Sequence, residues 1–147
     1  MQYFKILAIL AAFGAGSADA AGTEETTVDT AGATYQTAEA AILAGDFTGA
    51  LPILTALTAS EPDNADAWNL LGFASRKSGD LAAAGVAYGR ALDIDPDHLG
   101  ALEYQGEMYL ELKQPDMARA NLARLKDLCG DCEEAEDLAQ ALVAAGA

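Results

Sequence analysis

The chain has 147 residues, so it forms one domain or one domain preceded by a processed leader. Its composition is 52% hydrophobic but only 7% aromatic, and its many alanines and leucines favour helices over strands. The 8 basic and 23 acidic residues give a formal net charge of -15, which argues against a protein that binds nucleic-acid phosphates. The same charge opposes binding to anionic membranes and leaves basic proteins and cations as partners.

The first twenty residues have the pattern of a cleavable export signal. Lys5 precedes an apolar run, residues 6–16, that is too short to span a bilayer, and residues 18–20 have the small-residue pattern of a cleavage site. We therefore expect residues 1–20 to be a signal peptide and the mature protein to be periplasmic or secreted, without membrane insertion after cleavage. Residues 21–30 are polar and acidic, and they predict a flexible linker.

From residue 31 onward the sequence repeats with a period of 34. Residues at this interval are identical or similar: Gly45 and Gly79; Pro62 and Pro96; Ala50, Ala84 and Ala118; Leu54, Tyr88 and Leu122. Each unit contains two stretches of helical periodicity separated by a short turn. We therefore expect three helix–turn–helix units, at residues 31–64, 65–98 and 99–132.

The middle unit resembles the tetratricopeptide repeat, a 34-residue helical hairpin with packing residues at fixed offsets. The residues that carry this resemblance are Trp68, Leu71, Gly72, Ala84, Tyr88, Ala91 and Pro96. Because a stack of repeats needs a closed end, residues 133–147 predict a capping helix, with acids at its start where the helix dipole favours them. The resemblance implies an all-α fold: a short right-handed solenoid of three helical hairpins and a C-terminal capping helix.

In this family the first helix of each repeat lines a concave groove that binds peptides or protein segments. The resemblance places seven residues in that groove: Tyr35, Glu39, Asn69, Phe73, Arg76, Glu103 and Glu107. A groove that clamps a carboxylate is basic and carries asparagine, whereas the third repeat here contributes acids. We therefore expect a basic or mixed, partly apolar segment that docks on Phe73 and is attracted by Glu103 and Glu107. The alternative interpretation is that all seven positions are solvated and bind no ligand.

Two other clusters suggest chemistry but lack the pattern for it. Asp93, Asp95 and Asp97 lack the glycine and the distal glutamate of a calcium loop, so they predict a turn with capping acids. His98 is the only histidine, and no nucleophile elbow, phosphate loop or dinucleotide fingerprint accompanies it. We therefore expect no catalytic residue, no metal and no cofactor, and predict that the protein is not an enzyme.

The only two cysteines, Cys129 and Cys132, form a CxxC pair between the last repeat and the predicted cap. Haem attachment would require histidine where Glu133 stands, and zinc usually requires four sulfur or nitrogen ligands. Carboxylates on both sides of the pair disfavour the reactive thiolate. We expect a structural disulfide, because export leads to an oxidising compartment. Thiol exchange and metal delivery stay open as alternatives.

The sequence therefore favours a non-enzymatic interaction module, a periplasmic adaptor or assembly scaffold that binds a protein segment in the concave groove. The alternative from another functional class is an exported thiol-redox or metal-handling factor that uses the two cysteines. Self-association through the concave face is a third hypothesis.

Overall fold

The computed structural model describes residues 30–147, with side chains from Tyr35 onward. The predicted signal peptide and residues 21–29 of the predicted linker lie outside the described residues. The described part contains seven helices and no strand: α1 (Thr30–Leu43), α2 (Phe47–Ser60), α3 (Ala65–Lys77), α4 (Leu81–Ile94), α5 (Leu99–Glu111), α6 (Pro115–Cys129) and α7 (Glu133–Ala144). The predicted all-α fold is confirmed.

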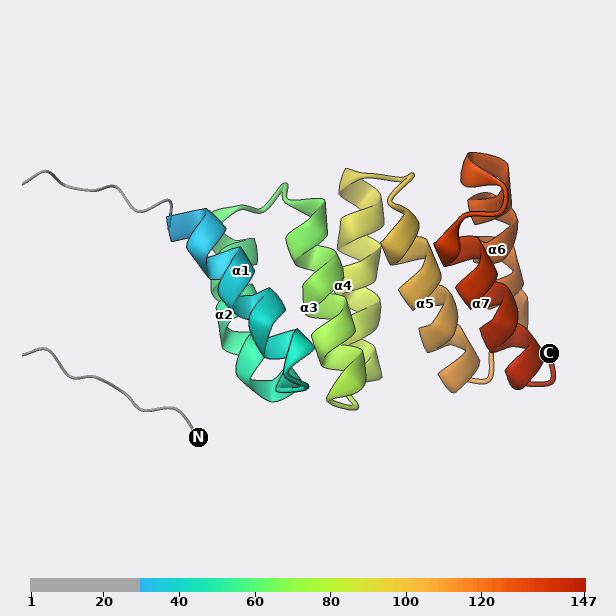
Figure 1. The fold of residues 1–147 in the computed structure, drawn as a ribbon, viewed down its shortest axis with the longest axis horizontal. Coiled ribbons are helices and arrows are strands. Elements are labelled where there is room, and N and C mark those ends of the chain that lie inside the picture. The colour runs from blue at the N-terminus through green and yellow to red at the C-terminus, as the bar shows by residue number, and fades with distance from the viewer. Residues whose placement is uncertain (1–29) are drawn as a thin grey trace, which may run out of the picture.

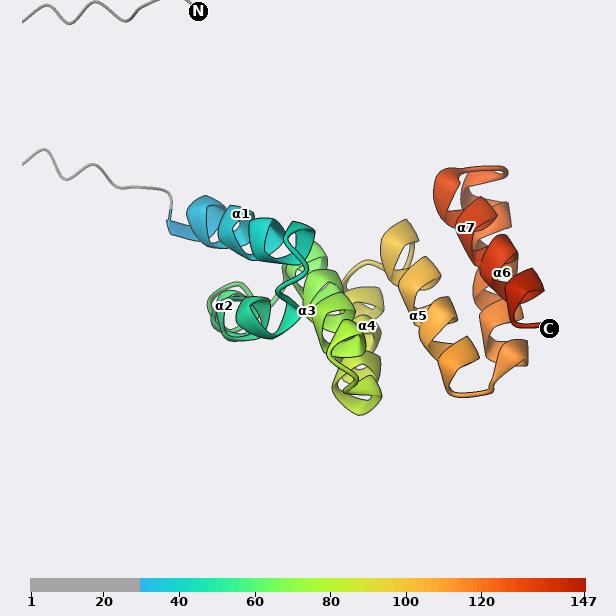
Figure 2. The same cartoon turned by 60° about the horizontal axis from the view of Figure 1, so that its bottom comes forward.

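The helices form antiparallel hairpins that stack in chain order along the long axis of the molecule (Figure 1). Within the described part, each odd-numbered helix packs against the next odd-numbered helix, whereas no Cα atom of α4 lies within 8 Å of a Cα atom of α2 or α6. Because the odd-numbered helices lie closer together, the stack curves toward them, and the turned view shows the hairpins changing direction along the stack (Figure 2). We call the surface formed by α1, α3, α5 and α7 the inner face.

The repeated Gly-Asp pair explains where the second helix of the first two hairpins begins. Gly45 and Gly79 adopt positive φ angles of 77° and 89°, a conformation that glycine reaches without strain. Asp46 and Asp80 then cap the following helices, because their side chains accept hydrogen bonds from backbone N–H groups three residues ahead. The third hairpin has Lys113 at the equivalent turn, with φ of 60°, and its second helix begins at a proline instead.

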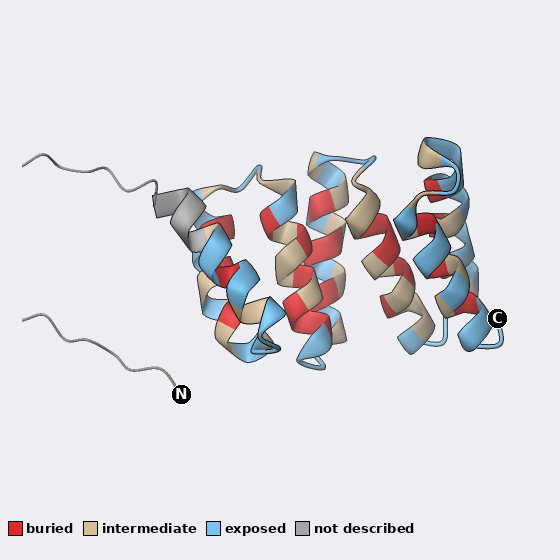
Figure 3. Ribbon diagram, in the orientation of Figure 1, coloured by how far each residue is buried: buried red, intermediate tan, exposed pale blue. Residues whose placement is uncertain are grey.

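Small residues on facing helices allow the close packing of this core. Buried residues gather where neighbouring helices face each other, most densely between α3, α4 and α5 (Figure 3). The ring of Tyr88 on α4 covers Gly72 on α3, and Leu138 on α7 covers Gly106 on α5. Together with Leu142, Leu138 also packs against the buried leucines of α5 and α6. Helix α7 therefore closes the apolar core at the end of the stack.

Candidate functional site

The odd-numbered helices carry all seven residues that the sequence assigns to a partner-binding groove. Helix α1 carries Tyr35 and Glu39, α3 carries Asn69, Phe73 and Arg76, and α5 carries Glu103 and Glu107. Their accessibility differs widely: Glu39 is exposed, while Asn69, Arg76 and Glu103 are buried. The seven positions therefore share one layer of the fold but differ in what they can offer a partner, and their role in binding stays a prediction.

Phe73 is the centre of a row of three half-buried aromatic rings, which we call the aromatic row. Its ring meets Phe47 of α2 edge to face, with centroids 6.0 Å apart, and Tyr104 of α5 at 4.9 Å. The Lys77 ammonium lies 5.4 Å from the centroid of the Phe73 ring, within cation–π range. Phe47 and Tyr104 were missed from the sequence, because they do not stand at the repeat positions that face the groove.

Arg76 does not stand free for a partner, because it joins two repeats from inside the fold. Its guanidinium nitrogens lie 2.5 Å from Glu107 and 2.7 Å from Glu111, both on α5, and only 4% of its side chain is exposed. Although burial lowers the pKa of Arg76, the hydrogen bond that Arg76 donates to Glu111 and the charge of Glu107 raise this pKa above its usual value. Arg76 therefore stays charged. It neutralises part of the negative charge of α5, which the sequence analysis assigned to partner binding.

Glu103 is the polar residue whose state differs most from the sequence-based expectation. It is 7% exposed and makes no hydrogen bond to the described residues. Burial raises the pKa of its carboxyl to about 8, and the charges of Glu107, Asp137 and Glu134 act in the same direction. The isolated protein therefore holds Glu103 mostly protonated at pH 7, so it does not supply the fixed negative charge that the sequence suggested.

Asn69 is a second buried polar residue on the inner face. It is 8% exposed, and its Oδ1 atom is buried without a hydrogen-bond partner in the described part. A Cβ atom at Gly100 of α5 would lie 3.2 Å from Asn69 Nδ2, so the glycine leaves room for the amide between the two helices. Asn69 and Gly100 thus mark a close approach of α3 and α5.

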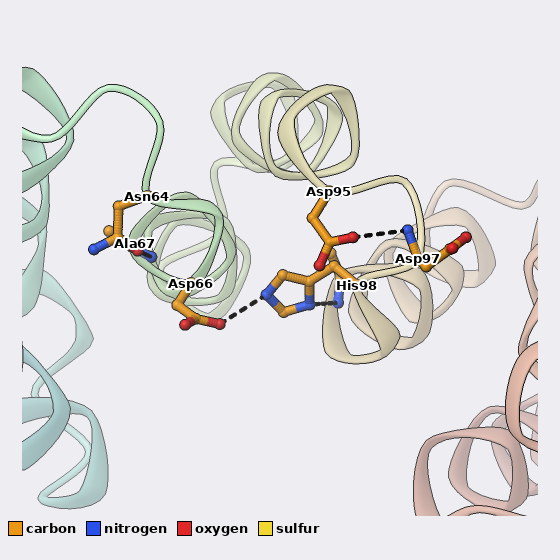
Figure 4. Close-up of polar contacts among 7 residues, drawn as sticks. Asn64, Asp66, Ala67, Asp95, Asp97 and His98 are labelled. Atoms are coloured by element: carbon orange, nitrogen blue, oxygen red, sulfur yellow. Dashed lines mark hydrogen bonds and ion pairs between the residues drawn. The ribbon is translucent and has the colours of Figure 1, made fainter.

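The turn at His98 links the starts of two odd-numbered helices (Figure 4). His98 caps α5, because its Nδ1 accepts a hydrogen bond of 3.2 Å from the N–H of Ala101, while its Nε2 lies 3.1 Å from Asp66 of α3. Asp95 accepts a bond from the N–H of Asp97 within the same turn. Among the described residues, no group of three or more histidine, cysteine or acidic side chains is arranged to hold a metal ion. These residues therefore act as structural caps here.

Cys129 and Cys132 stand on either side of a tight turn. Cys129 ends α6, Cys132 precedes the first residue of α7, and Gly130 between them has a positive φ of 71°. Their Cα atoms are 5.7 Å apart, a separation that a disulfide spans. The first turn of α7 carries three glutamates, Glu133, Glu134 and Glu136. The pair thus lies where two helices meet, and away from the aromatic row.

A pocket of about 400 Å³ opens on the opposite surface, between the outer helices α2 and α4. Its apolar walls include Leu51, Trp68, Leu71 and Val86, and Val86 is 71% exposed. The pocket lies where the backbones of α2 and α4 are more than 8 Å apart, because the outer layer of a curved stack spreads apart. None of the described helices is long and apolar enough to cross a membrane.

Comparison with known proteins finds a matching protein family and several solved structures with a similar fold. Residues 35–98 match the tetratricopeptide repeat as a protein family, and no curated protein matches the chain. MamA 41-end from Desulfovibrio magneticus RS-1 is 26% identical, with a TM-score of 0.63 over 65% of this chain and 54% of that one. This chain therefore spans only a little over half the length of that MamA structure.

Two other solved structures match over most of this chain. The first repeat domain of Spaghetti (RPAP3), bound to an HSP90 peptide, is 17% identical with a TM-score of 0.71, over 81% of this chain and 95% of that one. The Yersinia enterocolitica type III secretion chaperone SycD, in complex with a peptide of the translocator YopD, is 18% identical with a TM-score of 0.70, over 83% and 93%. At sequence identities this low, the structural similarity shows that these proteins and this chain share a fold.

Proposed function

Since the chain is a tetratricopeptide-repeat protein, we propose that it is a non-enzymatic scaffold that binds a peptide or protein segment on its inner face. The observation that carries the proposal is the aromatic row. Phe47, Phe73 and Tyr104 come from three different repeats and are half-buried, and the ring of Phe73 packs against each of the other two. Aromatic side chains of this kind bind a partner well, because they combine a large contact area with little loss of side-chain entropy. The Spaghetti domain and SycD, which share the fold, each hold a peptide.

We expect the bound segment to be basic or mixed, with at least one apolar side chain. The apolar part would pack on the aromatic row. Towards α7 the inner face carries Glu107, Glu134 and Asp137 around Glu103, because the charges of all three raise the pKa of the Glu103 carboxyl. The net charge of -15 adds a long-range attraction for basic segments, which raises association rates more than it raises affinity.

The sequence pattern of residues 1–20 supports export to the bacterial periplasm or secretion. In that oxidising compartment Cys129 and Cys132 would form a structural disulfide that fixes the turn between α6 and α7. The mature protein would then begin at Ala21 and present the helical stack to other exported proteins.

The proposal is tested by crosslinking and affinity capture with the mature protein in a periplasmic extract of its native source. Phe73→Ala and Tyr104→Ala each remove one ring of the aromatic row and should lower partner capture by about tenfold or more. Val86→Ala, on the outer helices, is the matched control and should capture partners as the wild type does. Circular dichroism of each variant verifies that the helices are kept.

Capture that is equal in all four proteins would refute the assignment of the inner face. Capture of only a second copy of the chain, lost in the aromatic variants, would support self-association through the same face instead. Glu103→Lys and Glu107→Lys test whether the acidic residues of the inner face attract a basic segment. Their results are interpreted after those of the aromatic variants, because Glu107→Lys also breaks the ion pair with Arg76.

A further inference from the structure

Glu103 and Asn69 are two buried residues of the inner face whose side-chain oxygens accept no hydrogen bond from the described residues. Asn69 Oδ1 is fully buried and unpaired, and Glu103 makes no hydrogen bond to the described residues although it is 7% exposed. The carboxylate oxygens of Glu103 are not among the fully buried unpaired atoms, so they keep some contact with the surface. An unpaired polar group at low exposure is costly, and a donor that pairs with it recovers that cost.

The two residues lie along the same strip between α3 and α5. Asn69 lies against Gly100, and Glu103 follows Gly100 by three positions, which places it one helical turn further along the same side of α5. Both residues carry acceptor oxygens, but Asn69 Oδ1 is fully buried, so the acceptor that keeps contact with the surface is the carboxyl of Glu103. The complementary ligand group is therefore a hydrogen-bond donor.

The charges around Glu103 select a cation among such donors. Helix α7 contributes Glu134 and Asp137, α5 itself contributes Glu107, and α3 contributes Arg76, the one cation in the set. Arg76 is already engaged by Glu107 and Glu111, and within the described part of the chain neither carboxylate of α7 forms an ion pair. The local field is therefore negative, and it rejects a second anion.

The other helices packed on α5 do not supply the missing cation. Helix α4 faces this region with Tyr88, whose pKa burial raises, so it stays neutral. Helix α6 faces α5 with Asn121, which donates to Leu102 O and to Gln105. The arginines of these two helices have partners elsewhere: Arg90 pairs with Asp63, Arg119 pairs with Asp116, and Arg124 bonds the carbonyl of Pro96. Lys126, the remaining cation of α6, is exposed and forms no ion pair with the described residues.

We propose that one lysine or arginine side chain of the bound segment docks on Glu103 between α5 and α7, and that Glu103 releases its proton to solvent as this side chain binds. The inference rests on the proposed function and specifies the chemistry of its partner. An arriving cation offsets the repulsion from Glu107, Glu134 and Asp137 and supplies the hydrogen bonds that the ionised carboxylate lacks. The carboxyl is protonated in the free protein because burial raises its pKa to about 8. Binding and deprotonation are therefore coupled.

The test uses a small probe, Nα-acetyl-lysine methylamide, followed by NMR of the Glu103 side-chain carboxyl. Its norleucine analogue, which has the same stem without the ammonium, is the uncharged control. With saturating lysine probe, the titration of Glu103 should move from about pH 8 to below about pH 7. The affinity of the probe should rise up to about tenfold between about pH 6.5 and 7.5, because one proton leaves per probe bound. The norleucine analogue should change neither quantity.

Two matched variants locate the effect. Glu103→Gln keeps the shape of the protonated side chain but cannot ionise, so its affinity for the lysine probe should be about tenfold lower near pH 7.5 and independent of pH. Glu136→Gln makes the same chemical change on the exposed side of α7 and should behave as the wild type. Failure of the lysine probe to bind, binding without a shift of the Glu103 titration, or unchanged pH dependence in Glu103→Gln each overturns the proposal.

The captured partner separates this inference from the proposed function. If Phe73→Ala lowers capture and Glu103→Gln does not, the inner face binds a partner but the basic contact at Glu103 is wrong. If neither substitution lowers capture, the proposed function itself fails. If both substitutions lower capture, the pH dependence decides. Both the proposed function and the inference stand if capture increases from about pH 6.5 to 7.5 with the wild type but not with Glu103→Gln.

Discussion

Single residues decide how closely the helices of this protein approach each other. Gly72 lies under the ring of Tyr88, and a Cβ atom added there would come within 2.5 Å of a ring carbon. The sequence pointed to this role, because small residues recur at the same place in successive repeats. Neither partner can move away easily, since Tyr88 is fully buried. The repeat therefore depends on the absence of a side chain at this position.

Gly72→Ala should lower the free energy of unfolding by about 1–3 kcal/mol, because the buried ring must shift to admit the methyl group. Gly89→Ala is the matched control on α4, where nothing lies within 4 Å of the added atom. It should leave stability unchanged or raise it by up to about 1 kcal/mol through helix propensity. Urea unfolding of both variants measures the difference, and equal stabilities would contradict the close packing.

Burial also decides the charge of Glu103, and this makes stability depend on pH. The folded protein holds the Glu103 proton up to about pH 8, whereas the unfolded chain releases it near the ordinary value for glutamate. Its stabilising contribution is therefore complete below about pH 4.5 and is lost as the pH rises towards 8. The loss amounts to at most about 1.4 kcal/mol per pH unit.

Glu103→Gln removes this proton linkage. Its stability relative to the wild type should rise between about pH 5 and pH 8, and the variant should be the more stable protein at pH 8. Urea unfolding at several pH values measures the difference, and Glu136→Gln should keep the wild-type slope. A constant difference between Glu103→Gln and wild type across this range would show that Glu103 is ionised in the folded state.

At the scale of the elements, each helix begins and ends where local chemistry requires it. The Gly-Asp pairs at 45–46 and 79–80 combine a left-handed turn with a capping carboxylate, and both recur with the period of the repeat. Helix α7 depends on tertiary packing as well, because Leu138 fills the space over Gly106 that a further repeat would otherwise occupy. Because α7 packs in this way, the turn between α6 and α7 also contributes to the stability of the fold.

The double variant Cys129→Ser, Cys132→Ser should lower the free energy of unfolding by roughly 2 kcal/mol relative to the oxidised wild type, because the short closed loop no longer restricts the unfolded chain. Adding a reductant should bring the wild type to the stability of the variant and leave the variant unchanged. Thermal unfolding with and without reductant measures both. Partner capture should stay the same. A loss of thiol exchange or copper transfer, with stability unchanged, would instead favour the redox or metal-handling alternative.

At the scale of the whole molecule, the curvature of the stack separates two surfaces with different properties. The inner face is closed by contacts between odd-numbered helices and crossed by the bonds of Arg76 to α5, while the outer helices spread apart around an apolar pocket. Because each hairpin contacts only its neighbours, these links between α3 and α5 hold the second and third repeats in register. Partner binding across several repeats would depend on that register.

The sequence by itself determined the helices, their turns and the repeat, because caps, left-handed glycines and packing residues act between positions close in the chain and recur every 34 residues. It also placed the seven candidate residues on the odd-numbered helices. Only the tertiary structure decided what those residues contact and how far they are buried. The pairing of Arg76 with Glu107 and Glu111, the contact of Phe73 with Phe47 and Tyr104, and the burial of Glu103 all join residues of different repeats. Such contacts depend on the rotation between neighbouring hairpins, which side-chain packing across the whole interface sets and no local pattern encodes.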